Sequence, residues 1–216
     1  MRVYHYLSAT WAIDDLKCGR LKVSRIDDLN DPFELLGAEL ADPDQRRFFL
    51  ATKEAIAQNH GVLCFSRGWR NPVMWSHYAD KHRGLCLGFD IPDDRTKRIR
   101  YDAKRLPSLI PRLLAGTPDS EALMKRLLFT KFRDWKYEAE VRVYTDLKDV
   151  DPPTGHYFAE FSGDFSLKEV IFGHRFEGPT TEIAQSVRPR FPGVTFIKAR
   201  LAFKSFRVVR NKSVVV

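Results

Sequence analysis

Three short segments of the sequence hold most of the side chains that could bind a ligand or move a proton. The first is Tyr4-His5-Tyr6, in which a histidine stands between two aromatic residues in a strand-forming stretch. A histidine on a strand can point into a pocket and hydrogen-bond a ligand hydroxyl. The alternative is an ordinary core or surface histidine with a local hydrogen-bond partner.

The second segment, residues 65–84, is rich in aromatic and polar side chains. A helix over residues 72–82 would place Trp75, Tyr78 and His82 on one face. An ordinary amphipathic helix has Leu or Val there, because the polar tips of Trp and Tyr need partners when they are buried. We interpret this face as one wall of a ligand site. Further candidates for the same wall are Ser66, Arg70 and His77.

The third segment, residues 131–142, ends in Glu138, Glu140 and Arg142 at alternate positions. Alternation along a strand puts these three side chains on one face of a sheet. A plain core strand would not hold polar residues at these positions, because burying an unpaired charge is expensive. Charge pairing on a solvated surface is the simpler alternative.

A fourth polar element, Asn30-Asp31-Pro32-Phe33-Glu34, is set among apolar residues. Asp31 can cap a helix, proline suits the first helical position, and Glu34 stands where a capping box requires it. We predict that this element begins a helix and also delivers side chains to the shared site. Asn30 or Asp31 should then lie close to the group of His5, Tyr78 and Glu140.

The elements that must position these residues mix strands and helices without a regular βαβ order. Strands are predicted at 2–8, 20–26, 62–67, 84–91 and repeatedly beyond residue 139, and helices at 10–19, 43–59, 72–82, twice within 107–133, and over 180–191. This order predicts an α+β fold, one domain over residues 1–216, with mixed or antiparallel sheets flanked by helices.

Composition narrows the class of partner. The net charge of +8 and the pI near 9.5 favour a polyanionic partner, either a nucleotide ligand or nucleic acid. No apolar run approaches the roughly 20 residues that span a bilayer, so no membrane partner is expected. Cys18, Cys64 and Cys86 are widely spaced, and Cys64 and Cys86 lie in apolar strand patterns. Buried free thiols and a cytoplasmic location are therefore predicted.

Several familiar catalytic motifs do not occur in the sequence. It contains no phosphate-binding glycine loop, no H-E-x-x-H and no G-x-S-x-G. His5 and His77 could join a carboxylate around a metal, but no pair of ligands has a diagnostic spacing. We assign no metal site from the sequence.

Taken in order, these segments resemble the bacterial family known as domain of unknown function 2971. The resemblance rests on "VYHYLS", "NDPFE", "CFS" followed by "MWSHYADKHRGLCLGF", and a final K-x-x-x-W-x-Y-E-x-E-x-R. The last motif corresponds to Lys131, Trp135, Tyr137, Glu138, Glu140 and Arg142. The match covers nearly the entire chain, and it names a family without naming an activity.

The order of the segments also resembles ADP-ribosyltransferases, which carry a His or Arg on the first strand and a late glutamate, often as E-x-E. This resemblance implies a transferase of toxin or phage-defence type that uses NAD, with a nucleic acid or protein as acceptor. It implies Glu140, His5 and Tyr78 as catalytic residues. The implied NAD-binding residues are His5, Tyr6, Ser66, Arg70, Trp75, Tyr78 and Arg142.

Two other classes of function fit the same residues. A nucleic-acid-binding protein would use the basic charge and the interleaved aromatic residues. If it were a metal-dependent nuclease, Asp31, Glu34, Glu138 and Glu140 would have to converge around Mg²⁺. A structural or interaction protein without an active site is the third class.

Overall fold

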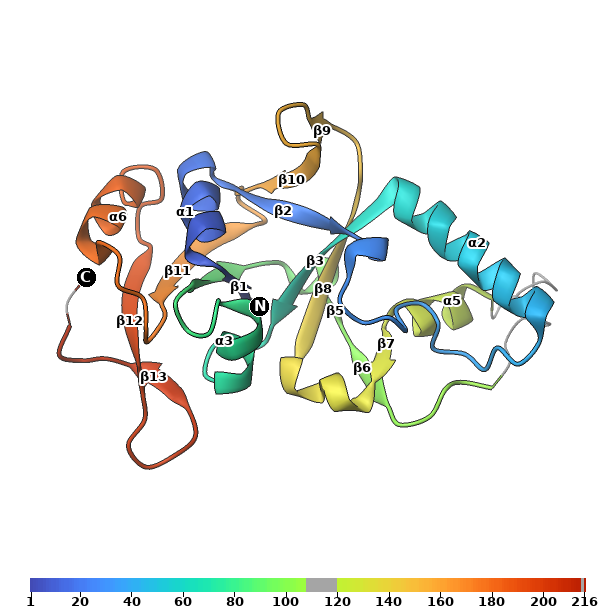
Figure 1. The fold of residues 1–216 in the computed structure, drawn as a ribbon. Helices are drawn as coiled ribbons and strands as arrows, with labels where there is room; N and C mark the ends of the chain where they lie inside the picture. The colour runs from blue at the N-terminus through green and yellow to red at the C-terminus, as the bar shows by residue number, and fades with distance from the viewer. Residues whose placement is uncertain (108–119, 215) are drawn as a thin grey trace. The chain divides into compact units, whose positions relative to one another are not determined.

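The computed structural model describes residues 1–107, 120–214 and 216. The chain divides into two compact units, each assembled from segments that are distant in sequence. Unit 1 comprises Met1–Lys22, Cys64–Thr96 and Phe158–Val216, and unit 2 comprises Val23–Leu63 and Lys97–Tyr157. Both units contain helices and strands, so the predicted α+β class is confirmed (Figure 1).

Unit 1 is built around a mixed sheet whose strands follow the order β13-β12-β11-β4-β1-β3. β1 pairs antiparallel with β4 from Arg2–Asp90 to Leu7–Leu85, and β4 pairs antiparallel with β11. β11 and β12 run parallel, and α6 lies between them in sequence. The strands are β1 (Arg2–Leu7), β3 (His60–Ser66), β4 (Leu85–Asp90), β11 (Ser166–Phe172), β12 (Thr195–Leu201) and β13 (Val208–Arg210). The boundary between the units falls within β3, whose first residues up to Leu63 belong to unit 2.

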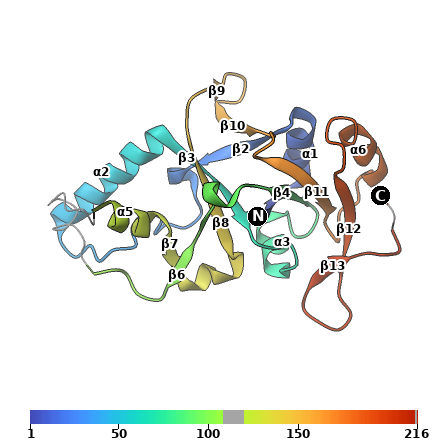
Figure 2. The ribbon, with the colours of Figure 1, turned by 180° about the vertical axis from the view of Figure 1, so that it is seen from behind.

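The helices of unit 1 are α1 (Ala9–Cys18), α3 (Pro72–Tyr78) and α6 (Thr180–Val187). α1 packs against α6 and β4, and the two helices lie side by side in both views (Figure 2). α1 ends where predicted, because Gly19 adopts the left-handed conformation (φ 72°) and its N–H donates to the carbonyl of Asp15 at 2.7 Å.

Unit 2 contains several short ladders. β2 (Arg20–Arg25) pairs with β3 through Ser24–Val62 and Arg25–Gly61, and β5 (Lys97–Arg98) pairs with β8 (Glu140–Asp146). β6 (Arg100–Asp102) runs parallel to β7 (Thr130–Phe132) as a separate two-stranded sheet. β9 (Val150–Asp151) pairs with the start of β10 (His156–Glu160).

Two helices close the core of unit 2. α2 (Pro43–Asn59) occupies the predicted range, and Asp42 caps it by accepting from the N–H groups of Asp44 and Gln45. α2 and α5 (Ser120–Leu128) meet through Phe49, Leu123 and Leu127, and they lie side by side in both views. The first of the two helices predicted within residues 107–133 falls largely on residues outside the described ranges.

The helix predicted over residues 72–82 is too long. α3 ends at Tyr78, and Asp80, Lys81 and His82 have φ values of 43°, 51° and 72°. The chain must turn tightly here, because a Cβ on Gly84 would lie 2.0 Å from the carbonyl oxygen of Leu7. A tertiary constraint therefore overrides the helical pattern, and Trp75, Tyr78 and His82 do not share one helical face.

The helix start predicted at residues 30–34 is also wrong. Residues 32–35 form turns, in which Asp31 Oδ1 accepts from the N–H of Phe33 at 2.9 Å and the Asp31 carbonyl accepts from the N–H of Glu34 at 3.0 Å. Leu35 then takes a left-handed conformation with φ 62°. An aspartate can accept hydrogen bonds from neighbouring N–H groups in such a turn as well as at a helix start. The same residue pattern therefore fits both structures.

The three cysteines carry free thiols, and Cys86 is buried, Cys64 half-buried and Cys18 exposed. The prediction of a buried thiol therefore holds fully at Cys86 and in part at Cys64. Within the described ranges, every helix is too short or too polar to cross a membrane.

Candidate functional site

The late charged motif forms a buried ion network in unit 2, centred on Arg142. The guanidinium of Arg142 binds both carboxylate oxygens of Glu34, with Nη1–Oε1 at 2.6 Å and Nη2–Oε2 at 2.8 Å. It also binds Glu140, with Nε–Oε1 at 2.6 Å. Arg142 and Glu34 are each 1% exposed and Glu140 is 4% exposed. Surface charge pairing is therefore excluded as the explanation of this motif.

Lys131 extends the network to a third carboxylate. Its ammonium nitrogen lies 2.8 Å from Oε2 of Glu140 and 2.8 Å from Oε2 of Glu138. The same ammonium lies 5.4 Å from the ring centroid of Trp135, within reach of a cation–π interaction. Five residues of the K-x-x-x-W-x-Y-E-x-E-x-R motif thus meet around one buried cluster: Lys131, Trp135, Glu138, Glu140 and Arg142.

Glu138 and Glu140 reach Lys131 by a different backbone path from the one predicted. Glu138 ends a 3₁₀ helix (Arg133–Glu138), and Ala139 then turns the chain in the left-handed conformation with φ 46°. β8 begins only at Glu140, whose N–H donates to the hydroxyl oxygen of Tyr101 at 2.7 Å. The prediction that one strand carries both glutamates is therefore wrong, although both carboxylates bind the same lysine.

The charges of the network shift the pKa values of Glu140 and Lys131. Burial by itself would raise the pKa of Glu140, but the positive charges of Arg142 and Lys131 outweigh burial and hold the pKa below its ordinary value. Burial would lower the pKa of Lys131, yet Glu140 and Glu138 raise it above its ordinary value. Each group therefore depends on its neighbours to remain charged inside the protein.

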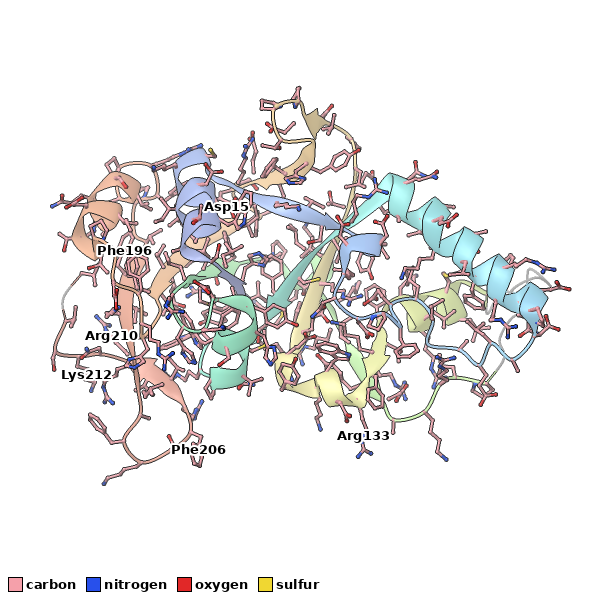
Figure 3. The ribbon with its side chains drawn as sticks, in the orientation of Figure 1. Asp15, Arg133, Phe196, Phe206, Arg210 and Lys212 are labelled. Atoms are coloured by element: carbon pink, nitrogen blue, oxygen red, sulfur yellow. The ribbon has the colours of Figure 1, made fainter. Side chains whose placement is uncertain are left out.

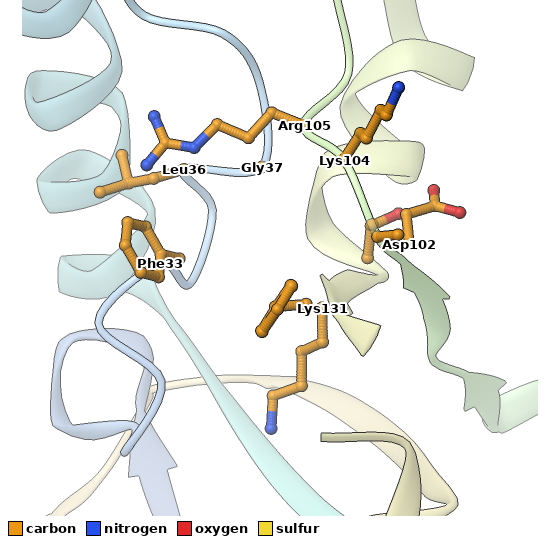
Figure 4. A pocket seen from close by; sticks show the side chains of 10 residues that line it. Phe33, Leu36, Gly37, Asp102, Lys104, Arg105 and Lys131 are labelled. Atoms are coloured by element: carbon orange, nitrogen blue, oxygen red, sulfur yellow. The ribbon is translucent and has the colours of Figure 1, made fainter. Parts of the chain in front are cut away.

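A pocket of about 290 Å³ lies beside this network, wholly within unit 2 (Figure 4). Three segments line it: the turn after Asp31 with the two residues beyond it, the end of β6 with the residues that follow, and strand β7. The lining residues are Phe33, Leu36, Gly37, Asp102, Ala103, Lys104, Arg105, Thr130, Lys131 and Phe132. The first two segments are joined by backbone hydrogen bonds, with Leu106 N–H donating to Gly37 O and Glu39 N–H donating to Leu106 O.

The ion network holds two walls of the pocket. Phe33 lines the pocket, and the next residue, Glu34, is bound by Arg142. The side chain of Lys131 also lines the pocket, and its ammonium is bound by Glu138 and Glu140. Because buried ion pairs have defined geometry, the network limits the positions that these two walls can adopt.

The rim and walls of the pocket combine exposed aromatic rings with positive charge. Phe33 is 50% exposed and Phe132 is 44% exposed, whereas core phenylalanines are almost fully buried. The guanidinium carbon of Arg105 lies 4.9 Å from the ring centroid of Phe33, and Lys104 precedes it on the same segment. Such a surface suits a flat ring joined to an anionic group.

Within the first strand, Tyr6 belongs to the core of unit 1 and His5 is half-buried. His5 is bound through Nδ1 to the carbonyl of Cys64 at 2.8 Å, and its ring lies edge-on to Phe65. Burial lowers the pKa of His5. Tyr6 donates its hydroxyl to the carbonyl of Gly68 at 2.9 Å. These contacts match the alternative of an ordinary histidine with a local hydrogen-bond partner, and the proposed pairing of His5 with Glu140 of unit 2 stays a prediction.

Trp75 is a core residue and not an open stacking surface. It is 0% exposed, its Nε1–H donates to the carbonyl of Trp69 at 2.6 Å, and its ring meets Tyr6 edge-on. The ring of His82 stacks on it at 6.1 Å between centroids. The predicted role of Trp75 in a ligand wall that binds NAD is therefore corrected, because its ring is covered by protein.

The remaining candidates of unit 1 lie in different environments. Ser66 is buried, with its Oγ 3.4 Å from the N–H of Gly68. Arg70 and His77 are exposed, and Tyr78 is half-buried beside the ring of His77. These three remain candidates for ligand contacts.

Within unit 2, the structure brings Glu34, Glu138, Glu140 and Arg142 together. Asn30 is exposed, whereas Asp31 is buried and caps its own turn. In residues 1–107, 120–214 and 216, no group of three or more His, Cys, Asp or Glu side chains is arranged to hold a metal ion. Of the four carboxylates that the nuclease alternative requires, Glu34, Glu138 and Glu140 bind Arg142 or Lys131 instead.

Sequence analysis missed most of the pocket. Leu36, Asp102, Lys104, Arg105 and Phe132 carry no motif, and they meet only because β6 pairs with β7 and the Asp31 turn packs beside them. Phe33 and Lys131 were visible inside larger motifs but had no assigned role. In Phe33-Glu34 and Lys131-Phe132 an aromatic residue adjoins a charged one, and these pairs are the sequence features that could have drawn attention to the pocket.

Comparisons with protein-family models, with curated proteins and with solved structures found no match for this chain. The two family resemblances of the sequence motifs therefore stay predictions, and the function has to be argued from the site itself.

Proposed function

We propose that this protein binds a nucleotide in the pocket of unit 2. The observation that carries the proposal is the combination, in one pocket, of the exposed rings of Phe33 and Phe132 with the cations Lys104 and Arg105. A nucleotide combines the two complementary features, a flat base and a phosphate group.

The size of the pocket limits which part of the ligand it encloses. A volume of about 290 Å³ is near the lower end of the range for small-molecule sites, and it suits one base or nicotinamide ring with part of its ribose. The phosphates would lie at the rim, where Arg105 can bind two oxygens at once and Lys104 adds a point charge. Asp102 also lines the pocket, and its carboxylate is paired with Arg100, so binding a ribose hydroxyl there would require this pair to rearrange.

NAD is the first dinucleotide to test, because the sequence resembles ADP-ribosyltransferases. In that reaction Glu140 would accept a hydrogen bond from the ribose 2′-hydroxyl and stabilise the positive charge of the oxocarbenium-like state. Its carboxylate already accepts from Arg142 and lies in contact with Lys131. The geometry thus gives stronger support to nucleotide binding, with Glu140 as a positioning residue, than to Glu140 as the catalytic group.

The test is isothermal titration calorimetry of the full chain with NAD, ADP-ribose and AMP. Phe33→Ala removes one stacking ring and Arg105→Gln removes one rim cation. We expect each variant to bind about tenfold more weakly, the usual scale for one stacking or charge-assisted contact. Phe48→Ala, which removes a partly exposed ring from α2, is the matched control and should bind as the unaltered protein does.

Nicotinamide release should be measured in the same NAD samples, because it separates binding from transfer chemistry. Binding that depends on Phe33 and Arg105 supports the proposal whether or not nicotinamide appears. No binding of any of the three ligands, or binding that both variants leave unchanged, would reject it.

A further inference from the structure

The loop between β12 and β13 in unit 1 exposes two aromatic rings almost completely. Phe203 is 89% exposed and Phe206 is 99% exposed. The loop is nevertheless held by backbone hydrogen bonds, with Ala202 N–H donating to Arg207 O and Val208 N–H donating to Arg70 O, both at 2.9 Å. Two exposed rings on an anchored loop leave apolar surface in contact with water and do not stabilise the core. Such exposed apolar surface indicates a site for an external partner.

The same hairpin is strongly basic. Residues 198–212 contain six Lys and Arg residues and no Asp or Glu. Lys198 is used internally, because its ammonium donates to the carbonyls of Gly173 and Phe176. The other five are Arg200, Lys204, Arg207, Arg210 and Lys212. Figure 3 shows Arg210 and Lys212 on the segment that follows the loop bearing Phe206.

A hollow of about 610 Å³ lies against this loop. Loop residues Leu201–Arg207 form one side, and Pro72 and His82 line the hollow as well. The His82 ring is supported from behind, since it stacks on the buried ring of Trp75 with an angle of 11° between the planes. The hollow therefore combines a supported aromatic surface with the cations of Lys204 and Arg207.

We propose that this hairpin and its hollow bind single-stranded nucleic acid. The exposed rings of Phe203 and Phe206 would stack on bases, and the cations around them would contact phosphates. The guanidinium of Arg200 already lies 4.5 Å from the ring centroid of Phe203, so ring and cation can act on one nucleotide. This surface shares no residue with the nucleotide pocket of unit 2.

The arrangement fits a single strand better than a lipid surface. A membrane-inserting loop places its rings at the tip and its cations behind them. Here Lys204 stands between the two rings in sequence, so inserting both rings would carry that cation toward the hydrocarbon. The hollow beside the loop also accepts a base from the side, which a flat lipid surface would leave unfilled.

The test is fluorescence anisotropy of the full chain with fluorescein-labelled oligouridylate and oligothymidylate of about 15 nucleotides, a length that covers a typical single-strand site. We expect Phe203→Ala and Phe206→Ala each to weaken binding about tenfold. Arg207→Gln and Lys204→Gln should each reduce the slope of log affinity against log salt by about 0.7. Phe48→Ala and Arg47→Gln on α2 are the matched ring and charge controls.

Each outcome of this experiment either supports or overturns the proposal. Weaker binding in the hairpin variants, with both controls unchanged, supports the proposal. Absence of binding at low salt, equal losses in the controls, or equal binding of a duplex with no effect of the ring variants would overturn it. Ring-dependent binding to phosphatidylserine vesicles without binding to the oligonucleotides would also overturn it, in favour of a membrane surface.

Discussion

The two units bury polar side chains in different ways. In unit 1, Tyr6 and Trp75 are tethered one at a time to backbone carbonyls, at 2.9 and 2.6 Å. In unit 2, Arg142, Lys131 and three glutamates are buried together and bind one another. A tethered aromatic side chain can lose its hydrogen bond alone, whereas removing one member of an ion network leaves its charged neighbours uncompensated.

The comparison explains why similar sequence clusters have different roles. Both units carry segments dense in polar and aromatic residues, but those of unit 1 mainly complete a core. The ion network of unit 2 supports an open pocket with solvent-exposed rings. The predictions below test this difference, beginning with the largest expected effect.

The first prediction concerns the centre of the network. Arg142→Met keeps much of the side-chain volume but leaves Glu34 and Glu140 without their guanidinium. We expect the free energy of unfolding to fall by about 3–5 kcal/mol, measured by urea denaturation. Arg142→Lys should recover only part of this loss, because an ammonium cannot bind both carboxylates in the bidentate geometry of Arg142. Stability unchanged in Arg142→Met would mean that the network contributes nothing to the fold.

The second prediction makes the matching change in unit 1. Trp75→Phe retains an aromatic ring but leaves the carbonyl of Trp69 without its donor. We expect a loss of about 1–3 kcal/mol in the free energy of unfolding, smaller than for Arg142→Met. Nucleotide binding should be unaffected once the protein is folded. A loss larger than that of Arg142→Met would reverse the contrast between the two units.

The third prediction is the pH dependence of the network. Since the native pKa of Glu140 lies below its ordinary value of 4.5, the native state holds fewer protons there than the unfolded state. Its contribution is fully present above pH 4.5 and is lost as the pH falls through the native pKa. Glu140→Gln should therefore lower stability at neutral pH and flatten the acid side of the stability curve.

Urea denaturation between neutral pH and about pH 3 measures this effect. Glu54→Gln, at an exposed carboxylate on α2, serves as the control. Its free energy of unfolding should depend on acid pH as that of the unaltered protein does. An acid side equally steep in Glu140→Gln and in the unaltered protein would show that other carboxylates account for it.

Much of the fold could be predicted because its signals are local. α1 ends at a glycine, α2 begins with Asp42 and Pro43, and β1 and β2 carry strand-forming residues. The failures have tertiary causes. Close packing of Gly84 against Leu7 ends α3 early. Asp31 accepts the hydrogen bond of the Phe33 N–H in a turn and not at the start of a helix.

The candidate site could be predicted only in part. The spacing of Glu138, Glu140 and Arg142 revealed the charged motif, but its burial depends on Glu34, which is 108 positions away from Arg142. The pocket depends further on the parallel pairing of β6 with β7, which places Asp102 opposite Phe132. Neither long-range contact has a local signature in a single sequence.

The central claim is that the buried network positions the walls of the nucleotide pocket. It is tested most directly by a double-mutant cycle of Glu34→Gln and Phe33→Ala, measured as ADP-ribose affinity by calorimetry. Glu34 does not line the pocket but anchors the turn that carries Phe33. We predict that Glu34→Gln alone weakens ADP-ribose binding about tenfold. In a protein that already carries Phe33→Ala, the same substitution should weaken binding almost no further. Independent, additive losses, or an affinity that Glu34→Gln leaves unchanged, would contradict the account.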